Sequence, residues 1–379
     1  MVVIQLEVLK LINFEIEDVR FQIDEKFNDS TKFKVESVPK SYDVFWNNNN
    51  PIDMIKHEYK DGDVILMDKH LYDLYPIKDK VTYLIEATED NKSIESILKF
   101  IEFLSSNNFN KGNKLIVVGG GITQDIGAFV GAVYKRGVDW VLFPSTLLSM
   151  CDSCIGGKTG INHKDVKNQL ALFSSPSKVI ICSQFINTLL PQDIKSGLGE
   201  ILKLFVTGGE YFINKYNEYV KNGEVISEEH YKFLIFGALF IKKVIVEYDE
   251  FELDIRKSLN YGHTIGHAVE SLSNYKIPHG QAVAVGMLVV NRMWKDYPDT
   301  LIESLCLDLI DKDDLRNIDF SNMKSLISKD KKTVGNETTF VFCDGFGGTF
   351  FEKIIVTDEV ADSIIDVVVE YADKGKSYE

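Results

Sequence analysis

The chain has 379 residues, of which 45% are hydrophobic and 26% are charged, and its formal net charge at pH 7 is −15. This length is sufficient to bury the cores of two domains, and the composition is that of a folded globular protein. The negative charge argues against a nucleic-acid surface or an anionic membrane as the main partner.

The lack of a signal-peptide pattern and the cysteine content predict a cytoplasmic location. Residues 1–18 contain Glu and Lys among apolar positions and lack the basic start of a signal peptide. Because no run of about 18 uninterrupted apolar residues is present, we expect no membrane span. Five cysteines are an odd and sparse set that suits a reducing compartment. Cys151 and Cys154 form a C-x-x-C without a second pair, and we interpret them as packing residues.

The first half of the chain alternates β-branched runs with helical patterns. Between two such runs, residues 93–106 carry apolar side chains at helical spacing. This alternation predicts a parallel sheet with helices on its faces, an α/β Rossmann-like arrangement. The expected buried strands are residues 63–68, 81–87, 114–121, 140–146 and 178–184.

The pattern changes after residue 190. Residues 194–246, 259–273, 281–294 and 361–374 have helical periodicity and few strand signals. We therefore expect an α/β NAD-binding domain over residues 1–189 and a mainly α-helical metal- and substrate-binding domain over residues 190–379. The cleft between two domains is the usual place for an active site.

Three glycines, Gly119 to Gly121, directly follow a predicted strand and precede a predicted helix. Such a junction lets backbone N–H groups approach a pyrophosphate at a helix N-terminus. The spacing is GGGxxxD and not GxGxxG, so the ordinary dinucleotide-binding fingerprint is absent. From these residues alone, a tight turn without a ligand and a helix-capping role for Asp125 remain open.

A polar block directly follows the next predicted strand, residues 140–146. Residues 144–168 combine Gly156, Gly157 and Gly160 with lysines and small polar residues, and we expect a loop-rich stretch. Glycines let a chain wrap closely around a ligand, and lysines suit phosphate or carboxylate groups. A solvated surface loop is the alternative, but the position directly after a buried strand favours ligand binding.

Three of the seven histidines, His263, His267 and His279, fall within seventeen positions. His263 and His267 are four residues apart on a predicted helix and so share a face. Glu200 lies in another predicted buried helix, next to Ile201. A catalytic zinc usually has three His or carboxylate ligands and an open position. The residues alone do not show which three of these four side chains would bind the metal.

The ordered blocks of this sequence resemble those of the 3-dehydroquinate synthase family, within the sugar-phosphate cyclases. The blocks span roughly residues 119–332 and read GGGITQD, RGVDWVLFPSTLL, DSCIGGKTGIN, KNQLALF, SGLGEILK, the DEFE to NYGHTIGH run over 249–267, HGQAVAVGM and DKK.

This resemblance implies a metal site, usually zinc with cobalt as an alternative, made by Glu200, His263 and His279. It assigns His267 to substrate binding and proton transfer. It also implies bound NAD, held by Gly120, Gly121, Asp125, Ser145, Thr146, Asp152, Lys158, Lys167 and Thr188, with Asp68, Glu89 and Lys92 as helpers.

The resemblance further implies an anionic sugar-phosphate substrate and a homodimer. One of Lys331 and Lys332, with Lys332 preferred, should reach the substrate, and Arg136 should come from the neighbouring subunit. The remaining expected substrate residues are Asp152, Lys158, Asn168, Lys203, Lys242, Arg256, Asn260 and His267.

The implied reaction converts 3-deoxy-arabino-heptulosonate 7-phosphate to 3-dehydroquinate and phosphate. It proceeds through transient oxidation by NAD, phosphate elimination, re-reduction and an aldol closure. Other sugar-phosphate cyclases with specialised substrates, and metal-dependent polyol or glycerol dehydrogenases, are the competing hypotheses. Departures from the family pattern, which concern substrate identity, are Gln124 for Gly, Ser145 for Thr, Ala171-Leu172 for Gly-Ala, Leu204-Phe205 for Tyr-Gly and Gln281 for Glu.

Overall fold

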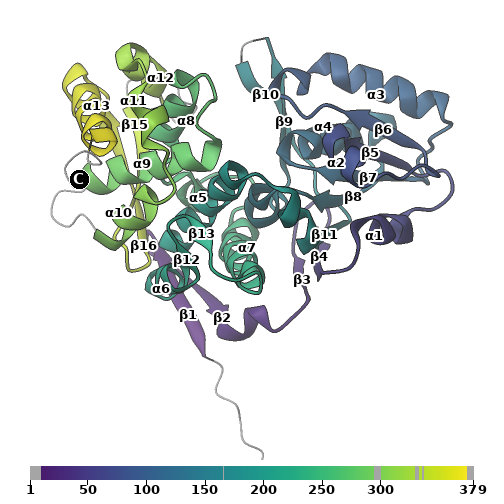
Figure 1. Ribbon diagram of the computed structural model, residues 1–379, viewed down its shortest axis with the longest axis horizontal. Coiled ribbons are helices and arrows are strands. Elements are labelled where there is room, and N and C mark those ends of the chain that lie inside the picture. Colours follow the sequence, from purple (N-terminus) through teal and green to yellow (C-terminus); the bar gives the residue numbers. More distant parts are fainter. Residues whose placement is uncertain (1–9, 165, 294–299, 329–332, 335–336, 374–379) are drawn as a thin grey trace, which may run out of the picture. The chain divides into compact units, whose positions relative to one another are not determined.

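The computed structural model describes residues 10–164, 166–293, 300–328, 333–334 and 337–373 (Figure 1). The chain divides into two compact units. Thr31–Gly197 form one unit, called here the sheet unit, and Met1–Ser30 with Leu198–Glu379 form the other, called here the helical unit.

The sheet unit is built on a seven-stranded sheet of order β3-β4-β11-β8-β7-β5-β6. Every neighbouring pair is parallel except β3 and β4. Its elements are β3 (Lys32–Val35), β4 (Tyr42–Asn47), α1 (Pro51–Glu58), β5 (Val64–Asp68), α2 (Lys69–Leu74), β6 (Thr82–Ile85), α3 (Ile94–Ser106), β7 (Lys114–Gly119), α4 (Gly121–Val133), β8 (Asp139–Pro144), β9 (Lys158–His163), β10 (Val166–Phe173), β11 (Lys178–Cys182) and the start of α5 (Pro191–Gly208).

The central strands could be predicted from the sequence because their residues are buried without interruption. Residues 64–67 of β5 and 115–119 of β7 are buried without interruption, as expected for strands covered on both faces. The predicted α/β fold class is therefore confirmed for this unit. The expected loop over residues 144–168 was wrong in part, because β9 and β10 form an antiparallel hairpin there.

The helical unit combines most of the helices with a five-stranded sheet of order β14-β15-β16-β1-β2. Its elements are β1 (Leu11–Ile16), β2 (Val19–Asp24), the rest of α5, α6 (Glu210–Tyr219), β12 (Val220–Lys221), β13 (Glu224–Val225), α7 (His230–Tyr248), α8 (His263–Leu272), α9 (His279–Met293), α10 (Thr300–Leu307), α11 (Lys312–Arg316), α12 (Met323–Ser328), β14 (Thr333–Val334), β15 (Glu337–Cys343), β16 (Gly348–Ile355) and α13 (Asp358–Asp373). The mainly helical character expected here is confirmed.

The first thirty residues do not follow the expected boundary at residue 189. β1 pairs with β2 in a hairpin and runs parallel to β16, which lies more than three hundred residues later in the chain. Phe14 and Ile16 are buried on one face of β1, and Phe27 contacts the rings of Phe212 and Phe233. These long-range contacts assign the N-terminal hairpin to the helical unit, and the second boundary falls inside α5.

Glycines bring α5, α8 and α9 into backbone contact. A Cβ on Gly199 of α5 would overlap the carbonyl oxygen of Gly280, in the first turn of α9. A Cβ on Gly286 of α9 would overlap the carbonyl oxygen of Gly262, directly before α8. Gly199, Gly262 and Gly280 are the sequence neighbours of Glu200, His263 and His279. The close approach of these helices therefore sets the spacing of those three side chains.

We predict that Gly286→Ala destabilises the protein, because the added methyl group must push the backbones of α8 and α9 apart. Overpacking of this kind costs about 1–3 kcal/mol. Chemical denaturation followed by circular dichroism measures the loss as a lower unfolding midpoint. Gly112→Ala is the matched control, since a Cβ at Gly112 meets nothing within 4 Å. Equal midpoints for the two variants would contradict the role given to this glycine contact.

Candidate active site

The expected cofactor residues of the sheet unit follow the carboxyl ends of its parallel strands. Asp68 ends β5, Gly120 follows β7, and Ser145 follows β8. Thr188 ends a 3-10 helix that begins directly after β11. Because the carboxyl ends of parallel strands share one edge of the sheet, the fold brings these residues to that edge, where α/β sheets bind ligands.

The glycine turn after β7 leaves the start of α4 open. Gly120 is the N-cap of α4, and no side chain caps this end of the helix. A Cβ on Gly120 would lie 2.9 Å from Thr146 Cγ2, so a larger residue would not fit there without displacing that side chain. The backbone N–H of Ser145 donates to the Gly119 carbonyl oxygen at 3.1 Å. Uncapped N–H groups at a helix N-terminus suit an anionic group such as a pyrophosphate.

Asp125 does not cap α4, so the capping role considered for it is wrong. Its Oδ2 lies 2.5 Å from Lys92 Nζ, and both side chains are largely buried. Burial raises the pKa of Asp125, while the Lys92 ammonium group acts in the opposite direction. The Asp125 carbonyl oxygen also accepts a hydrogen bond from Thr159 Oγ1 at 2.9 Å, which ties α4 to β9.

The β9–β10 hairpin carries several of the expected residues and binds the segment that contains Glu89. Asn162 Nδ2 donates to Glu89 Oε1 at 2.8 Å, and Lys167 Nζ lies 3.9 Å from the same oxygen. Asn168 has a positive φ of 51° and donates its backbone N–H to Asn162 Oδ1 at 2.9 Å. Lys158 is the exposed first residue of β9. The hairpin thus connects Glu89, Lys158, Lys167 and Asn168 in one substructure.

Asp152 lies in a π-helical turn, Ser149–Ser153, a conformation that is uncommon and often found at functional sites. The buried side chain of Gln124 holds this turn. Its Nε2 donates to the Ser153 carbonyl oxygen at 2.6 Å, and its Oε1 accepts from Ser153 Oγ at 2.8 Å. Gln124, one of the departures from the family pattern, therefore contacts the turn that carries the expected site residue Asp152.

Arg136 is placed differently from the other residues of the sheet unit. It lies at the far end of α4 from Gly121, in a 3-10 turn where Lys135 and Arg136 both have positive φ. Its side chain is exposed. The fold of this single chain does not bring Arg136 to the carboxyl edge of the sheet.

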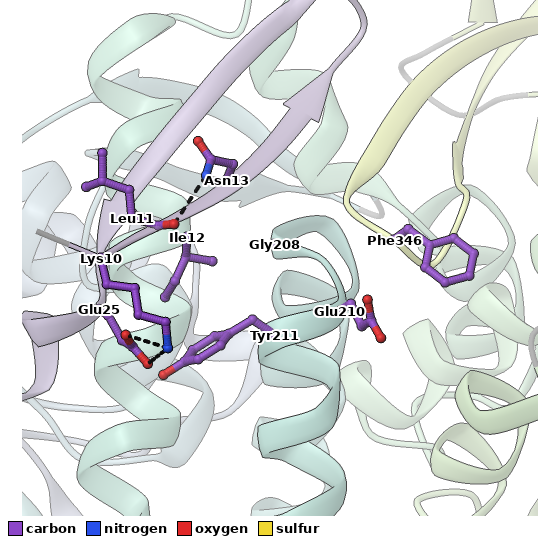
Figure 2. Close-up of a pocket in the computed structure, with 9 residues that line it drawn as sticks. All are labelled: Lys10, Leu11, Ile12, Asn13, Glu25, Gly208, Glu210, Tyr211 and Phe346. Atoms are coloured by element: carbon purple, nitrogen blue, oxygen red, sulfur yellow. Dashed lines mark hydrogen bonds and ion pairs between the residues drawn. The ribbon is translucent and has the colours of Figure 1, made fainter. Parts of the chain in front are cut away.

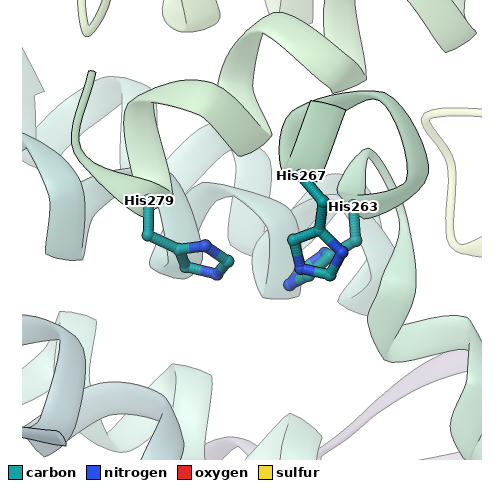
Figure 3. A group of neighbouring side chains, drawn as sticks. All are labelled: His263, His267 and His279. Atoms are coloured by element: carbon teal, nitrogen blue, oxygen red, sulfur yellow. The ribbon is translucent and has the colours of Figure 1, made fainter. Parts of the chain in front are cut away.

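In the helical unit, one glutamate and three histidines come together. Oε1 of Glu200, on α5, lies 3.5 Å from His263 Nε2 and 3.3 Å from His279 Nε2. His263 and His267 project from α8 and His279 from the start of α9, with their imidazoles facing a common space (Figure 3). One nitrogen from each ring lies within 4.8 Å of the others. Glu200 is buried, whereas His267 is the exposed member.

The second ring nitrogens face other acceptors. His279 Nδ1 lies 3.1 Å from Glu270 Oε2, and His263 Nδ1 lies 3.2 Å from the Tyr261 carbonyl oxygen. Burial acts to lower the pKa of His279, but the carboxylates of Glu200 and Glu270 outweigh it and raise this pKa to about 10. Lys203 Nζ, also buried, contacts Glu200 Oε2 at 2.5 Å.

This donor set fits a divalent metal ion. Two imidazole Nε2 atoms and one carboxylate oxygen converge, as in His and carboxylate sites for catalytic zinc. Glu200 Oε1 is buried and accepts no hydrogen bond of good geometry from the described residues. Contacts from Nδ1 to a carboxylate and to a carbonyl are the usual outer partners of metal-bound histidines. The geometry brings His267 into the same group and does not separate it from the ligands.

Three further expected substrate residues lie in the helical unit, and Lys242 and Arg256 are buried there. The guanidinium of Arg256 donates from Nη1 to the Glu250 carbonyl oxygen, and its backbone N–H donates to Asp249 Oδ2 at 3.0 Å. Asn260 Nδ2 donates to Glu252 Oε1 at 2.9 Å. Lys331 and Lys332 lie outside the described residues.

Sequence reasoning missed Glu270. His263, His267 and Glu270 have the spacing i, i+4, i+7, which places all three on one face of α8. That pattern was available in the sequence, but a glutamate near the end of an amphipathic helix is equally consistent with a surface charge.

A pocket elsewhere on the helical unit contains none of the expected site residues. Lys10 and Glu25 form an ion pair of 3.1 Å at its edge, beside Tyr211 (Figure 2). Phe346, in the turn between β15 and β16, also lines it and is exposed. The histidine group is therefore separate from this pocket.

Comparison with known families covers both units. The family model for 3-dehydroquinate synthase N-terminal matches residues 82–196, and that for 3-dehydroquinate synthase C-terminal matches residues 197–333. A 3-dehydroquinate synthase from Pelagibacter ubique is 36% identical over 288 residues, which cover 71% of this chain and 77% of that protein. The chain belongs to the 3-dehydroquinate synthase family.

Other matches are shorter or more distant. The 3-dehydroquinate synthase of Clostridium tetani is 41% identical over 221 residues, 58% of each chain. The chain spans somewhat over half the length of the first curated relatives it matches. A solved structure of 2-deoxy-scyllo-inosose synthase complexed with carbaglucose-6-phosphate, NAD+ and Co2+ has a TM-score of 0.75 and 19% identity, and covers 90% of this chain and 100% of that one. At that identity the likeness shows the fold alone.

The family assignment rests on models that together span residues 82–333. It also agrees with the division of the structure, since the boundary between the two family models falls within one residue of the boundary between the units. Among the described residues, no helix is long and apolar enough to cross a membrane.

Proposed function

We propose that this protein is a phosphate-eliminating cyclase, a carbon–oxygen lyase, that converts 3-deoxy-arabino-heptulosonate 7-phosphate to 3-dehydroquinate. The observation that carries the proposal is the convergence of Glu200, His263 and His279 in a member of this family. Three buried cations of the helical unit, Lys203, Lys242 and Arg256, suit a substrate that bears both a carboxylate and a phosphate.

The proposal includes NAD and a divalent metal ion, zinc or cobalt. Glu200, His263 and His279 would hold the metal, and the uncapped start of α4 with the adjoining strand ends would hold NAD. The structural relative bound to NAD+ and Co2+ supports this pair. When bound, NAD supplies a reversible hydride acceptor and the metal a Lewis acid for sugar oxygens.

The protein's own residues would position the substrate and move protons. His267, the exposed member of the histidine group, would exchange a proton with the substrate phosphate or a ring hydroxyl. Lys242 and Arg256 would take the carboxylate, since a guanidinium suits bidentate contact with a planar anion. Lys158 and Asn168 of the hairpin would contact the phosphate, with Asp152 in the π-helical turn nearby in sequence.

We further propose a homodimer in the cytoplasm. Arg136 lies away from the carboxyl edge of its own sheet, so a role for it at the substrate requires a second copy of the chain. The five cysteines are buried and form no disulfide, which fits a reducing compartment.

We predict that the purified protein, supplied with Zn2+ and NAD, releases phosphate from the heptulosonate phosphate without net accumulation of NADH. A phosphate assay, absorbance of NADH and identification of the ring product measure this outcome. Accumulation of NADH without phosphate release would instead indicate a polyol dehydrogenase. Faster phosphate release from sedoheptulose 7-phosphate or glucose 6-phosphate would indicate a cyclase with a specialised substrate.

We predict that Arg256→Gln lowers kcat/KM by about 30-fold to several thousand-fold, because loss of one member of a buried charge pair costs about 2–5 kcal/mol. Steady-state kinetics with the heptulosonate phosphate measure the loss. Because Arg256 is buried, thermal unfolding and metal content must show that the variant folds and still binds metal. Arg292→Gln, which removes an exposed ion pair with Glu370, is the control and should keep wild-type kinetics. Unchanged kinetics in the Arg256 variant would refute the carboxylate assignment.

A further inference from the structure

Glu270 makes a contact with the histidine group that the proposed reaction does not use. It lies on α8, three residues after His267, and its Oε2 is 3.1 Å from His279 Nδ1. Its side chain is mostly buried, with 15% of its surface exposed. A buried carboxylate that contacts one ring nitrogen of a histidine, while the other nitrogen faces a candidate metal position, has a specific physical effect on that ring.

We propose that Glu270 is a positioning residue that fixes His279 for metal binding. It accepts a hydrogen bond from Nδ1–H and so selects the tautomer in which Nε2 carries the free lone pair. In the structure, Nε2 of His279 points to Glu200 Oε1 at 3.3 Å while Nδ1 points to Glu270. The inference rests on the proposed function in one respect, because it takes the metal to lie at Glu200, His263 and His279.

His279 has more need of such a partner than His263. It is the first residue of α9, where the backbone gives less support than a helix interior, and 31% of its side chain is exposed. His263 has 12% exposure, and its Nδ1 contacts the backbone carbonyl oxygen of Tyr261 at 3.2 Å. A neutral carbonyl can fix a tautomer as well as a carboxylate can. The carboxylate also raises the basicity of the ring and offsets part of the charge of a divalent ion.

A purely structural role for Glu270 would have a different signature. In that case its removal would lower the stability of α8 and α9 but leave the metal affinity of the folded protein unchanged. As a positioning residue, its removal weakens metal binding in protein that remains folded. Loss of an outer partner of this type typically costs about 10–100-fold in metal affinity.

The test measures the affinity of the metal-free protein for Zn2+ by competition with a chromophoric chelator, and the visible absorption spectrum after loading with Co2+. We compare wild type with Glu270→Ala and Glu270→Gln, the second of which keeps the side-chain volume and a neutral acceptor. The expected result is about a 10–100-fold loss of Zn2+ affinity in Glu270→Ala, a smaller loss in Glu270→Gln, and an altered Co2+ spectrum in Glu270→Ala.

Glu247→Gln is the matched control. Its carboxylate is likewise partly buried, with 21% exposure, but it pairs with Lys243 at 2.7 Å on α7. This variant should bind Zn2+ with wild-type affinity. Far-ultraviolet circular dichroism and thermal unfolding verify the fold of each variant, and Glu270→Gln keeps the test decisive if Glu270→Ala does not fold.

Two results in a folded variant, either Glu270→Ala or Glu270→Gln, would together overturn the inference. These are a Zn2+ affinity equal to that of wild type and an unchanged Co2+ spectrum. Failure of the wild type to bind either metal would overturn it together with the metal site. A third outcome separates the two proposals. If the variants bind metal more weakly but the wild type releases no phosphate, the inference is supported and only the proposed substrate is refuted.

Discussion

The carboxylate of Glu200 is the group around which the rest of the candidate site is arranged. It lies inside α5 at 2% exposure, among apolar neighbours such as Ile201 and Leu202. Removing a carboxylate from water costs several kcal/mol unless partners replace the lost hydration. Lys203 supplies one partner at Oε2, and the imidazoles of His263 and His279 face Oε1. A cation shared by Oε1 and the two Nε2 atoms would complete this compensation.

Such an arrangement requires that three helices hold their positions to within a fraction of an ångström. Backbone contacts between Gly199 and Gly280, and between Gly262 and Gly286, provide this constraint, although glycines have no functional group of their own. Each expected metal ligand is adjacent to one of these glycines. Packing without side chains allows little adjustment, so it can fix donor atoms more firmly than contacts between flexible groups.

Much of the fold could be predicted from the sequence because its strongest signals are local. The central strands of the sheet unit are continuous apolar runs, and the helices of the helical unit show clear periodicity. The N-terminal hairpin could not be assigned, since its partner strand β16 lies at the other end of the chain. The β9–β10 hairpin was taken for a loop because Gly156 and Gly157 directly precede it, and its own Gly160 and polar residues hide the strand pattern.

In the candidate site, too, local features could be predicted from the sequence and long-range contacts could not. Helical spacing predicted that His263 and His267 share a face, and in the structure His279 of α9 lies with them. Two other contacts join segments that are distant in sequence, so no local pattern predicts them. They are the ion pair of Asp125 with Lys92 and the hydrogen bond of Gln124 to the π-helical turn. Glu270 was overlooked for a different reason, since a helical glutamate is common and only its distance to His279 distinguishes it.

The most direct test of the metal centre is the anomalous scattering of a crystal of the zinc-loaded protein, measured on both sides of the zinc absorption edge. The proposed metal site predicts one strong peak within coordination distance of Glu200 Oε1, His263 Nε2 and His279 Nε2, with His267 outside that distance. A peak coordinated by the three histidines without Glu200, or no peak near this group, would contradict it.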